Sequence, residues 1–346
     1  MSYLVRRLLL AVPTFIGITL VCFSLTRFLP GGPVEMRLMR QRGISQAGAA
    51  AAGPSARAQA VSEEHRKQIA AQFGFDKPLW QQYANWLVRD FMGLKLSSYD
   101  YPDKTAWQLI RSRLPVSLWF GIAAFILTYL VCIPLGIVKA LKHRQTFDAV
   151  SSLVVFAGYA IPTFALAMCA KMLFCGTVDG FFDIFPIGGI SSDFDVEPSF
   201  TVWLLDRMWH MVLPVACYVA GSFAMLTLLM KNSLLDQIAA DYIRTVIAKG
   251  ATRTRAVWCH ALRNALVPVA TGFGSMIGLL FAGSIVIETI FDIPGMGRLG
   301  WDALVGRDYA VFLALLSLTS ALQLAGNLIS DILYMLIDPR IDFSKR

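Results

Sequence analysis

The sequence predicts an all-α integral membrane protein with six transmembrane helices. Its 346 residues are 56% hydrophobic and only 16% charged, which leaves too little polar surface for a soluble globule. Several apolar runs are long enough to cross a bilayer, which takes about 20 residues of helix. Lys and Arg gather at the edges of these runs. The net charge of +8 therefore reflects membrane topology and gives no reason to expect nucleic-acid binding.

The first predicted transmembrane helix covers residues 1–30, with its apolar part at 8–29. Arg6 and Arg7 precede the apolar part and favour a cytoplasmic N-terminus. A signal peptide would have a shorter apolar core and a small-residue cleavage site, and this run reaches Pro30 without one. We therefore interpret the run as a membrane-spanning helix.

Residues 31–113 are predicted to form a partly helical periplasmic segment. Residues 45–61 are rich in Ala, Gly and Ser, so we expect poor order there. Residues 63–73 have the pattern of a helix, and a second short helix follows with an apolar stripe that includes Tyr83 and Trp86. These aromatic side chains suit either packing against the transmembrane helices or contact with another protein.

Residues 114–346 contain the other five predicted membrane helices. Pro162 interrupts the second of these five and leaves backbone groups that need partners in protein or water. Gly274, Gly278 and Ala282 form a small-residue seam that allows close helix packing in the fourth. The basic loops place both termini in the cytoplasm. The five predicted ranges are 114–141, 150–174, 209–229, 268–290 and 312–337.

Three polar features near these spans each allow two interpretations. Lys171 can extend to the membrane surface or contact a substrate. The acidic segment 175–208 suits a solvated loop or a surface for a binding partner. A polar stripe at helical spacing in the last helix suits either contacts between helices or a translocation path. The stripe consists of Ser320, Gln323, Asn327, Ser330 and Asp331.

A basic, helix-prone segment at residues 235–265 lies between two apolar runs and is predicted to be cytoplasmic. Its first half has apolar residues such as Tyr242 at helical spacing, which predicts an amphipathic helix. Gly250 suits the left-handed position that ends this helix, and Thr252 or Thr254 can cap a second one. An amphipathic helical hairpin held at the membrane surface is suited to docking another protein.

The sequence contains no recognisable catalytic group. It has no GxxxxGK[ST] phosphate loop, and its four histidines lie in segments assigned to different sides of the membrane. The six cysteines lie mostly in or beside apolar runs and form no CxxC pair, so we expect neither a disulfide framework nor a zinc site. We therefore expect no catalytic residue, cofactor or metal ion on this chain. Uphill transport would need an energy source on another chain.

The stretches RTVIAKG and HALRNALVP, which begin within residues 235–265, resemble the EAA loop of ABC importer permeases, in the form found in the dipeptide and oligopeptide B-type permeases. Arg244, Thr245 and Val246 stand where the general family pattern has Glu-Ala-Ala, and Gly250 matches the motif glycine. The resemblance covers nearly the whole chain. Five further stretches resemble in particular the Yej-type permeases linked to microcin C and peptide uptake: FGFDKP, RSRLPVS, YAIP, LLMKNSLLDQI and RLGWDALVGRDY.

This resemblance implies the MetI-like fold of type I ABC importer permeases and a place in the bacterial inner membrane. The chain would be the transmembrane permease subunit of a binding-protein-dependent importer of peptides or peptide-like compounds, microcin C among them. In that family the EAA loop is the coupling helix that fits a groove on the cytoplasmic ATPase. The coupling residues so implied are Asp241, Tyr242, Arg244, Thr245, Ala248, Lys249, Gly250, Arg253, His260, Ala261, Arg263 and Asn264.

The partners implied by the resemblance are a second homologous permease, two ATP-binding domains on separate or fused chains, and a periplasmic substrate-binding protein. ATP and Mg²⁺ would be bound by those partners, with the lipid bilayer and the peptide as further contacts. The alternative function is a stand-alone secondary transporter, which needs ionisable relays inside the membrane and inverted repeats. Only Lys171 and Asp331 qualify, and both lie near helix ends. A membrane-embedded enzyme would need a catalytic cluster at one depth, and the sequence places none.

Overall fold

The computed structural model describes residues 2–28, 77–101, 103–177, 182–194, 198–270, 272 and 283–337. These residues form helices joined by turns, and within them only two isolated β-bridges occur. The chain divides into two compact units. Unit 1 contains Met1–Leu9, Arg113–Arg298 and Ala321–Arg346, and unit 2 contains Leu10–Ser112 and Leu299–Ser320.

Among the described residues, four helices are each long and apolar enough to cross a membrane, and a bent pair of helices counts as a fifth candidate span. The four are α1 (Ser2–Phe28), α5 (Ala106–Leu141), α8 (Phe200–Ala239) and α14 (Tyr309–Ile337), and the pair is α6 (Thr146–Ala160) with α7 (Thr163–Phe174). Most of the remaining predicted span, with Gly274, Gly278 and Ala282, lies outside the described residues, as do 45–61 and 63–73.

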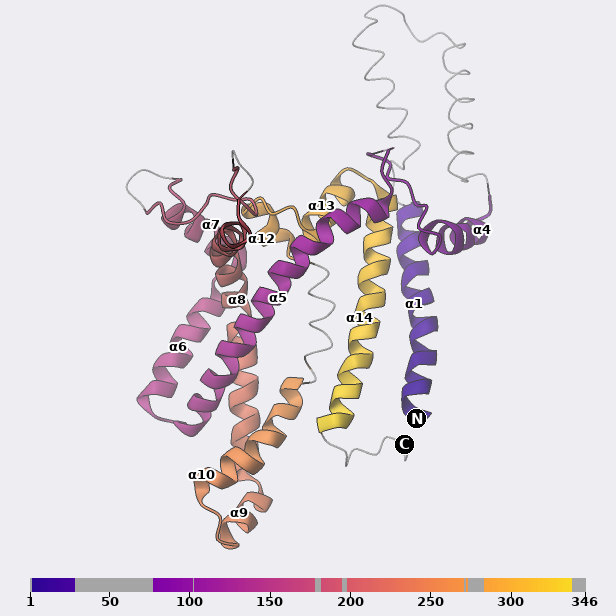
Figure 1. Ribbon diagram of the computed structural model, residues 1–346. Coiled ribbons are helices and arrows are strands. Elements are labelled where there is room, and N and C mark those ends of the chain that lie inside the picture. Colours follow the sequence, from indigo (N-terminus) through magenta and orange to yellow (C-terminus); the bar gives the residue numbers. More distant parts are fainter. Residues whose placement is uncertain are drawn as a thin grey trace, which may run out of the picture. The chain divides into compact units, whose positions relative to one another are not determined.

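The predicted interruption at Pro162 is a bend of 95° between α6 and α7. Ile161 has an extended backbone, with φ −79° and ψ 123°, because a residue before proline is disfavoured in the helical region. The carbonyl of Pro162 then accepts the first hydrogen bond of α7, from the N–H of Leu166 at 3.0 Å. Both helices pack against α8 (Figure 1).

Two spans exceed their predicted ranges most, α8 and α5. The pattern gives residues 209–229 for α8, which runs from Phe200 to Ala239, and α5 begins at Ala106 instead of 114. Apolar periodicity marks the part of a helix that crosses lipid, whereas the helix itself continues through polar residues such as Lys231 and Asp236. The extension carries α8 directly to the predicted cytoplasmic hairpin.

One apolar core of unit 1 joins α5, α7, α8 and α12 (Ile285–Ile290). Phe120 of α5, Met211 of α8 and Ile287 of α12 are buried there together, with exposures of 2%, 5% and 0%. Lys171 of α7 donates a hydrogen bond from Nζ to the carbonyl of Ile290 at 2.7 Å. This bond satisfies a carbonyl at the end of α12 and gives Lys171 an intramolecular partner.

In unit 2, the predicted aromatic stripe packs against α1. The short helices α4 (Leu79–Ala84) and η1 (Asn85–Phe91) carry Tyr83 and Trp86, whose rings lie 5.5 and 5.6 Å from the ring of Phe23. The hydroxyl of Tyr83 also lies 2.8 Å from Oγ1 of Thr19. Of the two interpretations of these aromatics, the structure therefore supports packing against a transmembrane helix.

In a second part of unit 2, hydrogen bonds to the side chain of Asp308 join residues 98–100 to the start of α14. Asp308 is 2% exposed, and its Oδ2 accepts hydrogen bonds from the hydroxyl of Ser98 and the N–H groups of Tyr99 and Asp100. Its Oδ1 accepts from the N–H of Val311 at 3.2 Å, in the first turn of α14. The sequence gives no local signal for these bonds, because Ser98 and Asp308 are 210 residues apart in the chain.

Candidate functional site

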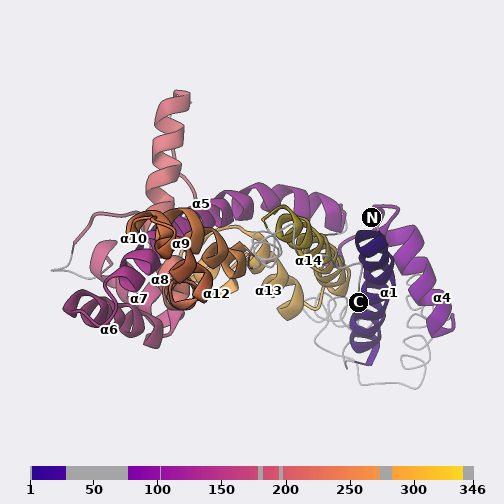
Figure 2. The same cartoon turned by 90° about the horizontal axis from the view of Figure 1, so that it is seen from below.

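The segment predicted to dock a partner folds as a compact helical hairpin that continues from α8. Its elements are α9 (Asp241–Ala248), α10 (Arg253–Ala256) and η2 (Val257–Ala261), followed by helical residues 262–270. Figure 2 shows α9 and α10 next to each other, and they are in contact. The sequence predicted one amphipathic helix in the first half of this segment, but the backbone is extended at Ala240, with ψ 145°. This break allows Ile243 to enter the same core as Leu234 of α8.

The turn between the two arms depends on Gly250. Its φ is +94°, in the left-handed region that favours glycine, and its N–H donates to the carbonyl of Ile247 at 2.9 Å. The hydroxyl of Thr252 then accepts a hydrogen bond from the N–H of Arg255 at 3.3 Å and caps α10. The sequence predicted both features, with Thr254 as the alternative cap.

An apolar core fixes the hairpin to two transmembrane helices of unit 1. Ile243 and Ala261 of the hairpin are buried with Met230 of α8 and with Ala140 of α5, at 4% exposure or less. At Gly136 of α5 an added Cβ would lie 2.7 Å from Cβ of Met230, so the helices approach closely there. A displacement of the hairpin must therefore move the ends of α5 and α8 with it.

Side-chain hydrogen bonds reinforce this attachment. The hydroxyl of Tyr242 donates to Oε1 of Gln237 at 2.8 Å and accepts from Nδ2 of Asn264 at 3.1 Å. The hydroxyl of Ser233 donates to the carbonyl of Ala265 at 2.8 Å. These bonds connect the end of α8, the first arm and the second arm. Tyr242 and Asn264, both predicted site residues, thus hold the two arms together.

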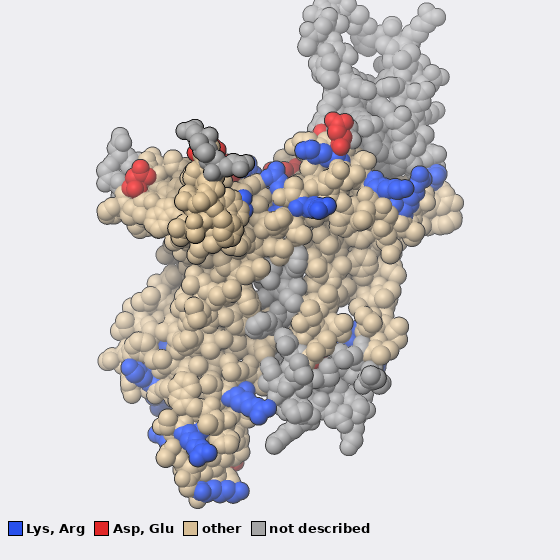
Figure 3. All heavy atoms as spheres, in the orientation of Figure 1, with Lys and Arg blue, Asp and Glu red and all other residues tan. Residues whose placement is uncertain are grey.

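The outer surface of the hairpin carries most of the other predicted residues. One face of α9 presents Asp241, Arg244, Thr245 and Ala248 at helical spacing, all exposed. Arg244 and Asp241 form an exposed ion pair at 3.6 Å. Figure 3 shows Lys and Arg side chains over the lower tip, where Figure 1 places α9 and α10. The remaining exposed members of the predicted set are Lys249, Gly250, Arg253, His260, Arg263 and Asn264.

Ala261 differs from the other predicted residues because it is fully buried, at 0% exposure. It contributes to the core that supports the hairpin and offers no surface to a partner. Two apolar side chains that the sequence analysis did not assign to the surface are exposed instead, Trp258 at 50% and Ile247 at 40%. Trp258 lies in the π-helical turn η2, for which the sequence gives no local signal.

The predicted polar stripe of α14 is divided among different partners. The hydroxyl of Ser320 donates to the carbonyl of Leu316 at 2.7 Å, within its own helix. Nε2 of Gln323 donates to Oδ1 of Asn327 at 3.1 Å, one turn away. Asp331 forms an ion pair with Arg7 of α1, within unit 1. Asn327 is exposed and Gln323 is half-buried, so this amide pair is the part of the stripe that lies at the helix surface.

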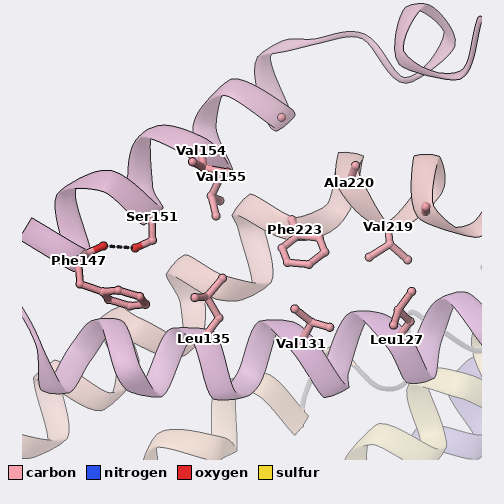
Figure 4. Close-up of a pocket in the computed structure, with 12 residues that line it drawn as sticks. Leu127, Val131, Leu135, Phe147, Ser151, Val154, Val155, Val219, Ala220 and Phe223 are labelled. Atoms are coloured by element: carbon pink, nitrogen blue, oxygen red, sulfur yellow. Dashed lines mark hydrogen bonds between the residues drawn. The ribbon is translucent and has the colours of Figure 1, made fainter. Parts of the chain in front are cut away.

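A cavity of about 570 Å³ lies between α5, α6 and α8 (Figure 4). Its lining is apolar except for Ser151, whose hydroxyl donates to the carbonyl of Phe147 at 2.6 Å. A peptide needs polar partners for its backbone, and this cavity supplies none that is uncommitted. Among the described residues, no group of three or more His, Cys, Asp or Glu side chains is arranged to hold a metal ion.

Comparison with known proteins identifies relatives over the full length of the chain. Residues 132–343 match the family described as binding-protein-dependent transport system inner membrane component. The inner membrane ABC transporter permease protein YejB of Escherichia coli O157:H7 is 36% identical, over 100% of both chains. The peptidoglycan transport system permease protein YejB of Agrobacterium fabrum is also 36% identical, over 100% of this chain and 99% of the relative. The dipeptide transport system permease protein DppB of Escherichia coli K12 is 34% identical, over 100% of both chains.

Proposed function

Because the chain belongs to the family of binding-protein-dependent transport system inner membrane components, as a peptide ABC transporter permease subunit, we propose that its hairpin docks the ATPase that drives transport. The main support for docking at the hairpin is that α9 has an exposed charged face, while a buried core attaches the hairpin to α5 and α8. A surface that binds a partner and cannot move independently of the spans is suited to transmit force.

The docking surface in this proposal consists of the exposed coupling residues and two apolar neighbours. Arg244 and the other charged side chains would set the orientation of the partner, and Trp258 and Ile247 would supply apolar contact area. Aromatic and Arg side chains are common among the residues that dominate binding energy at protein interfaces. The bond between Tyr242 and Asn264 would support this surface by holding its two arms together.

The docking proposal requires the hairpin and both termini to face the cytoplasm. The concentration of Lys and Arg on the hairpin supports this orientation. The ion pair between Arg7 and Asp331 brings the first turns of α1 to the last turns of α14, which supports placing both termini on the same side of the membrane. The membrane location itself, as a multi-pass inner membrane protein, follows from the family and the apolar helices.

In the proposed complex, this chain pairs with a second homologous permease and two ATP-binding domains that hold ATP and Mg²⁺. A periplasmic binding protein delivers the cargo. Closure of the ATP-binding domains would displace the hairpin, and the shared core would carry this displacement to α5 and α8. Transport then proceeds by alternating access between two states whose balance ATP and the loaded binding protein shift.

The proposed cargo is a peptide or a peptide-like compound, with microcin C as one candidate. The relatives named for dipeptide and for peptidoglycan transport support this breadth of cargo. The translocation path in this proposal includes Gln323 and Asn327, whose neutral amides can exchange hydrogen bonds with a peptide backbone. Ser320 and Asp331 flank this pair on α14.

The test is a pull-down of the tagged chain from mild detergent, co-expressed with its partner subunits, with and without residues 236–263 scrambled. Recovery of an ATPase and a second permease with the intact segment only is the expected result. A charge reversal at Lys95, which is exposed and lies outside the hairpin, serves as the control and should leave recovery unchanged. Transport by the isolated chain in liposomes, without any ATPase, would instead favour a stand-alone secondary transporter.

A further inference from the structure

A buried ionic cluster connects the ends of α5, α6 and α8 beside the hairpin. Its centre is Asp148 of α6, whose side chain is 8% exposed. Nζ of Lys231 in α8 donates to both carboxylate oxygens, at 2.7 and 2.8 Å. Nζ of Lys139 in α5 lies 3.3 Å from Oδ1 of the same carboxylate. One acidic group therefore holds two ammonium groups from two other helices.

Lys139 is the most deeply enclosed member of the cluster, with a side chain that is 0% exposed. Its Nζ also donates to the carbonyl of Asp148 at 3.1 Å and to the hydroxyls of Ser151 and Ser152, each at 2.8 Å. All these additional partners belong to α6. Lys139 therefore fixes the orientation of α6 relative to α5 through several directed bonds.

Two groups of the α5–α6 turn complete the cluster. Oδ2 of Asp148 accepts a hydrogen bond from the N–H of Arg144 at 3.3 Å and lies 3.3 Å from Nδ1 of His143. Arg144 has a φ of +64°, a backbone conformation that the N–H contact to Asp148 helps to hold. The carboxylate thus organises both helices and the turn between them.

The position of the cluster relates it to the hairpin. Lys231 follows Met230, which is buried in the core shared with Ile243 and Ala261 of the hairpin. Lys139 precedes Ala140, another member of that core. The core connects the hairpin to α5 and α8, whereas the hydrogen bonds of Asp148 connect those two helices to α6.

We propose that Asp148 is the positioning residue that makes α6 follow the hairpin when the docked ATPase displaces it. This inference rests on the proposed function of the hairpin. Neutralising the carboxylate would leave two neighbouring ammonium groups, one fully buried, without their shared counter-charge. The end of α6 would then separate from α8, and the displacement of α5 and α8 would no longer be passed to that end of α6.

The experiment measures the distance between spin labels at Val150 of α6 and Asp236 of α8, which are both exposed. The six native cysteines are replaced by alanine, and the complex with the ATPase is studied in nanodiscs, nucleotide-free and trapped with ATP and vanadate. For the unsubstituted cluster we expect one narrow distance that is the same in both states. In Asp148→Asn we expect a broader distribution and a shift of about 2 Å or more on trapping.

Three further variants keep the test informative if Asp148→Asn folds poorly. Asp148→Glu retains the carboxylate and should keep the narrow distance, whereas Lys231→Met removes one connection and should shift it. Lys142→Met is the matched control, because Lys142 is an exposed lysine near the same turn whose ammonium lies over the ring of Phe147, outside the cluster. A purely structural role for Asp148 would lower the yield without a shift that depends on nucleotide.

Two results would overturn the inference: a label distance that already changes on trapping in the unsubstituted cluster, or unchanged distances in both Asp148→Asn and Lys231→Met. Co-purification of the ATPase is scored separately, so that loss of docking counts against the proposed function of the hairpin. If docking is lost, the label distance in the isolated, nucleotide-free chain still tests the cluster. Asp148→Asn should broaden this distance distribution even when no partner is bound.

Discussion

The carboxylate of Glu288 occupies the space that a side chain at Gly295 would need. Glu288 is 1% exposed, and its two oxygens accept hydrogen bonds from the N–H groups of Ser284 and Arg298, at 3.1 and 2.7 Å. The loop from Ser284 to Arg298 therefore wraps around one buried acidic group in unit 1. The N–H of Met296 donates to the hydroxyl of Ser117 at 2.7 Å, which fixes the same loop to α5.

The contact between Gly295 and Glu288 predicts that Gly295→Ala is destabilising. The added methyl group would overlap the carboxylate, and overpacking of this kind costs about 1–3 kcal/mol. Gly300→Ala in α13 (Met296–Val305) is the matched control, since its nearest neighbour, Cδ1 of Leu315, lies at 3.7 Å. Thermal unfolding of the purified variants in detergent should show a lower midpoint for Gly295→Ala only. Equal midpoints would contradict the packing argument.

The second prediction concerns the charge of Glu288. Glu288→Gln replaces one accepting oxygen by an amide N–H₂ group that faces a backbone donor, so one hydrogen bond is lost at a cost of about 1–3 kcal/mol. Asp292→Asn is the control on the same loop, because Asp292 is 71% exposed and its ion pair with Arg298 is a surface contact. Denaturant or thermal unfolding should separate the two variants. A similar loss for both would argue that the loop does not depend on the buried carboxylate.

The third prediction tests the backbone at Gly250. No atom lies within 4 Å of the position of an added Cβ, so any effect of substitution arises from the φ of +94°. Gly250→Val should cost about 1–2 kcal/mol locally and abolish recovery of the ATPase, while the chain still inserts. Gly250→Asn should retain recovery, because Asn tolerates the left-handed region. Normal recovery and peptide uptake by the Val variant would exclude this turn from the docking site.

The fourth prediction concerns the exposed surface of the hairpin. Arg244→Glu and Trp258→Ala should each weaken binding of the purified ATPase by about tenfold or more, without lowering the yield of the permease. Lys95→Glu is the control for the charge reversal. Surface-immobilised permease in nanodiscs would report the dissociation constants. An unchanged constant for both hairpin variants would place the docking surface elsewhere on the chain.

The sequence by itself determined the helical membrane class, the family and the hairpin with its glycine turn. These features are local, because apolar run length, basic flanks and the Gly250 signal all lie within short stretches. The tertiary structure decided where long-range partners meet. The Asp148 cluster joins residues from three helices. Asp308 accepts hydrogen bonds from Ser98, which is 210 residues away in the chain, and from the two residues after it. Lys171 donates a hydrogen bond to a carbonyl at the end of α12. Such contacts depend on helix packing in three dimensions, and a pattern read along one chain carries no signal for them.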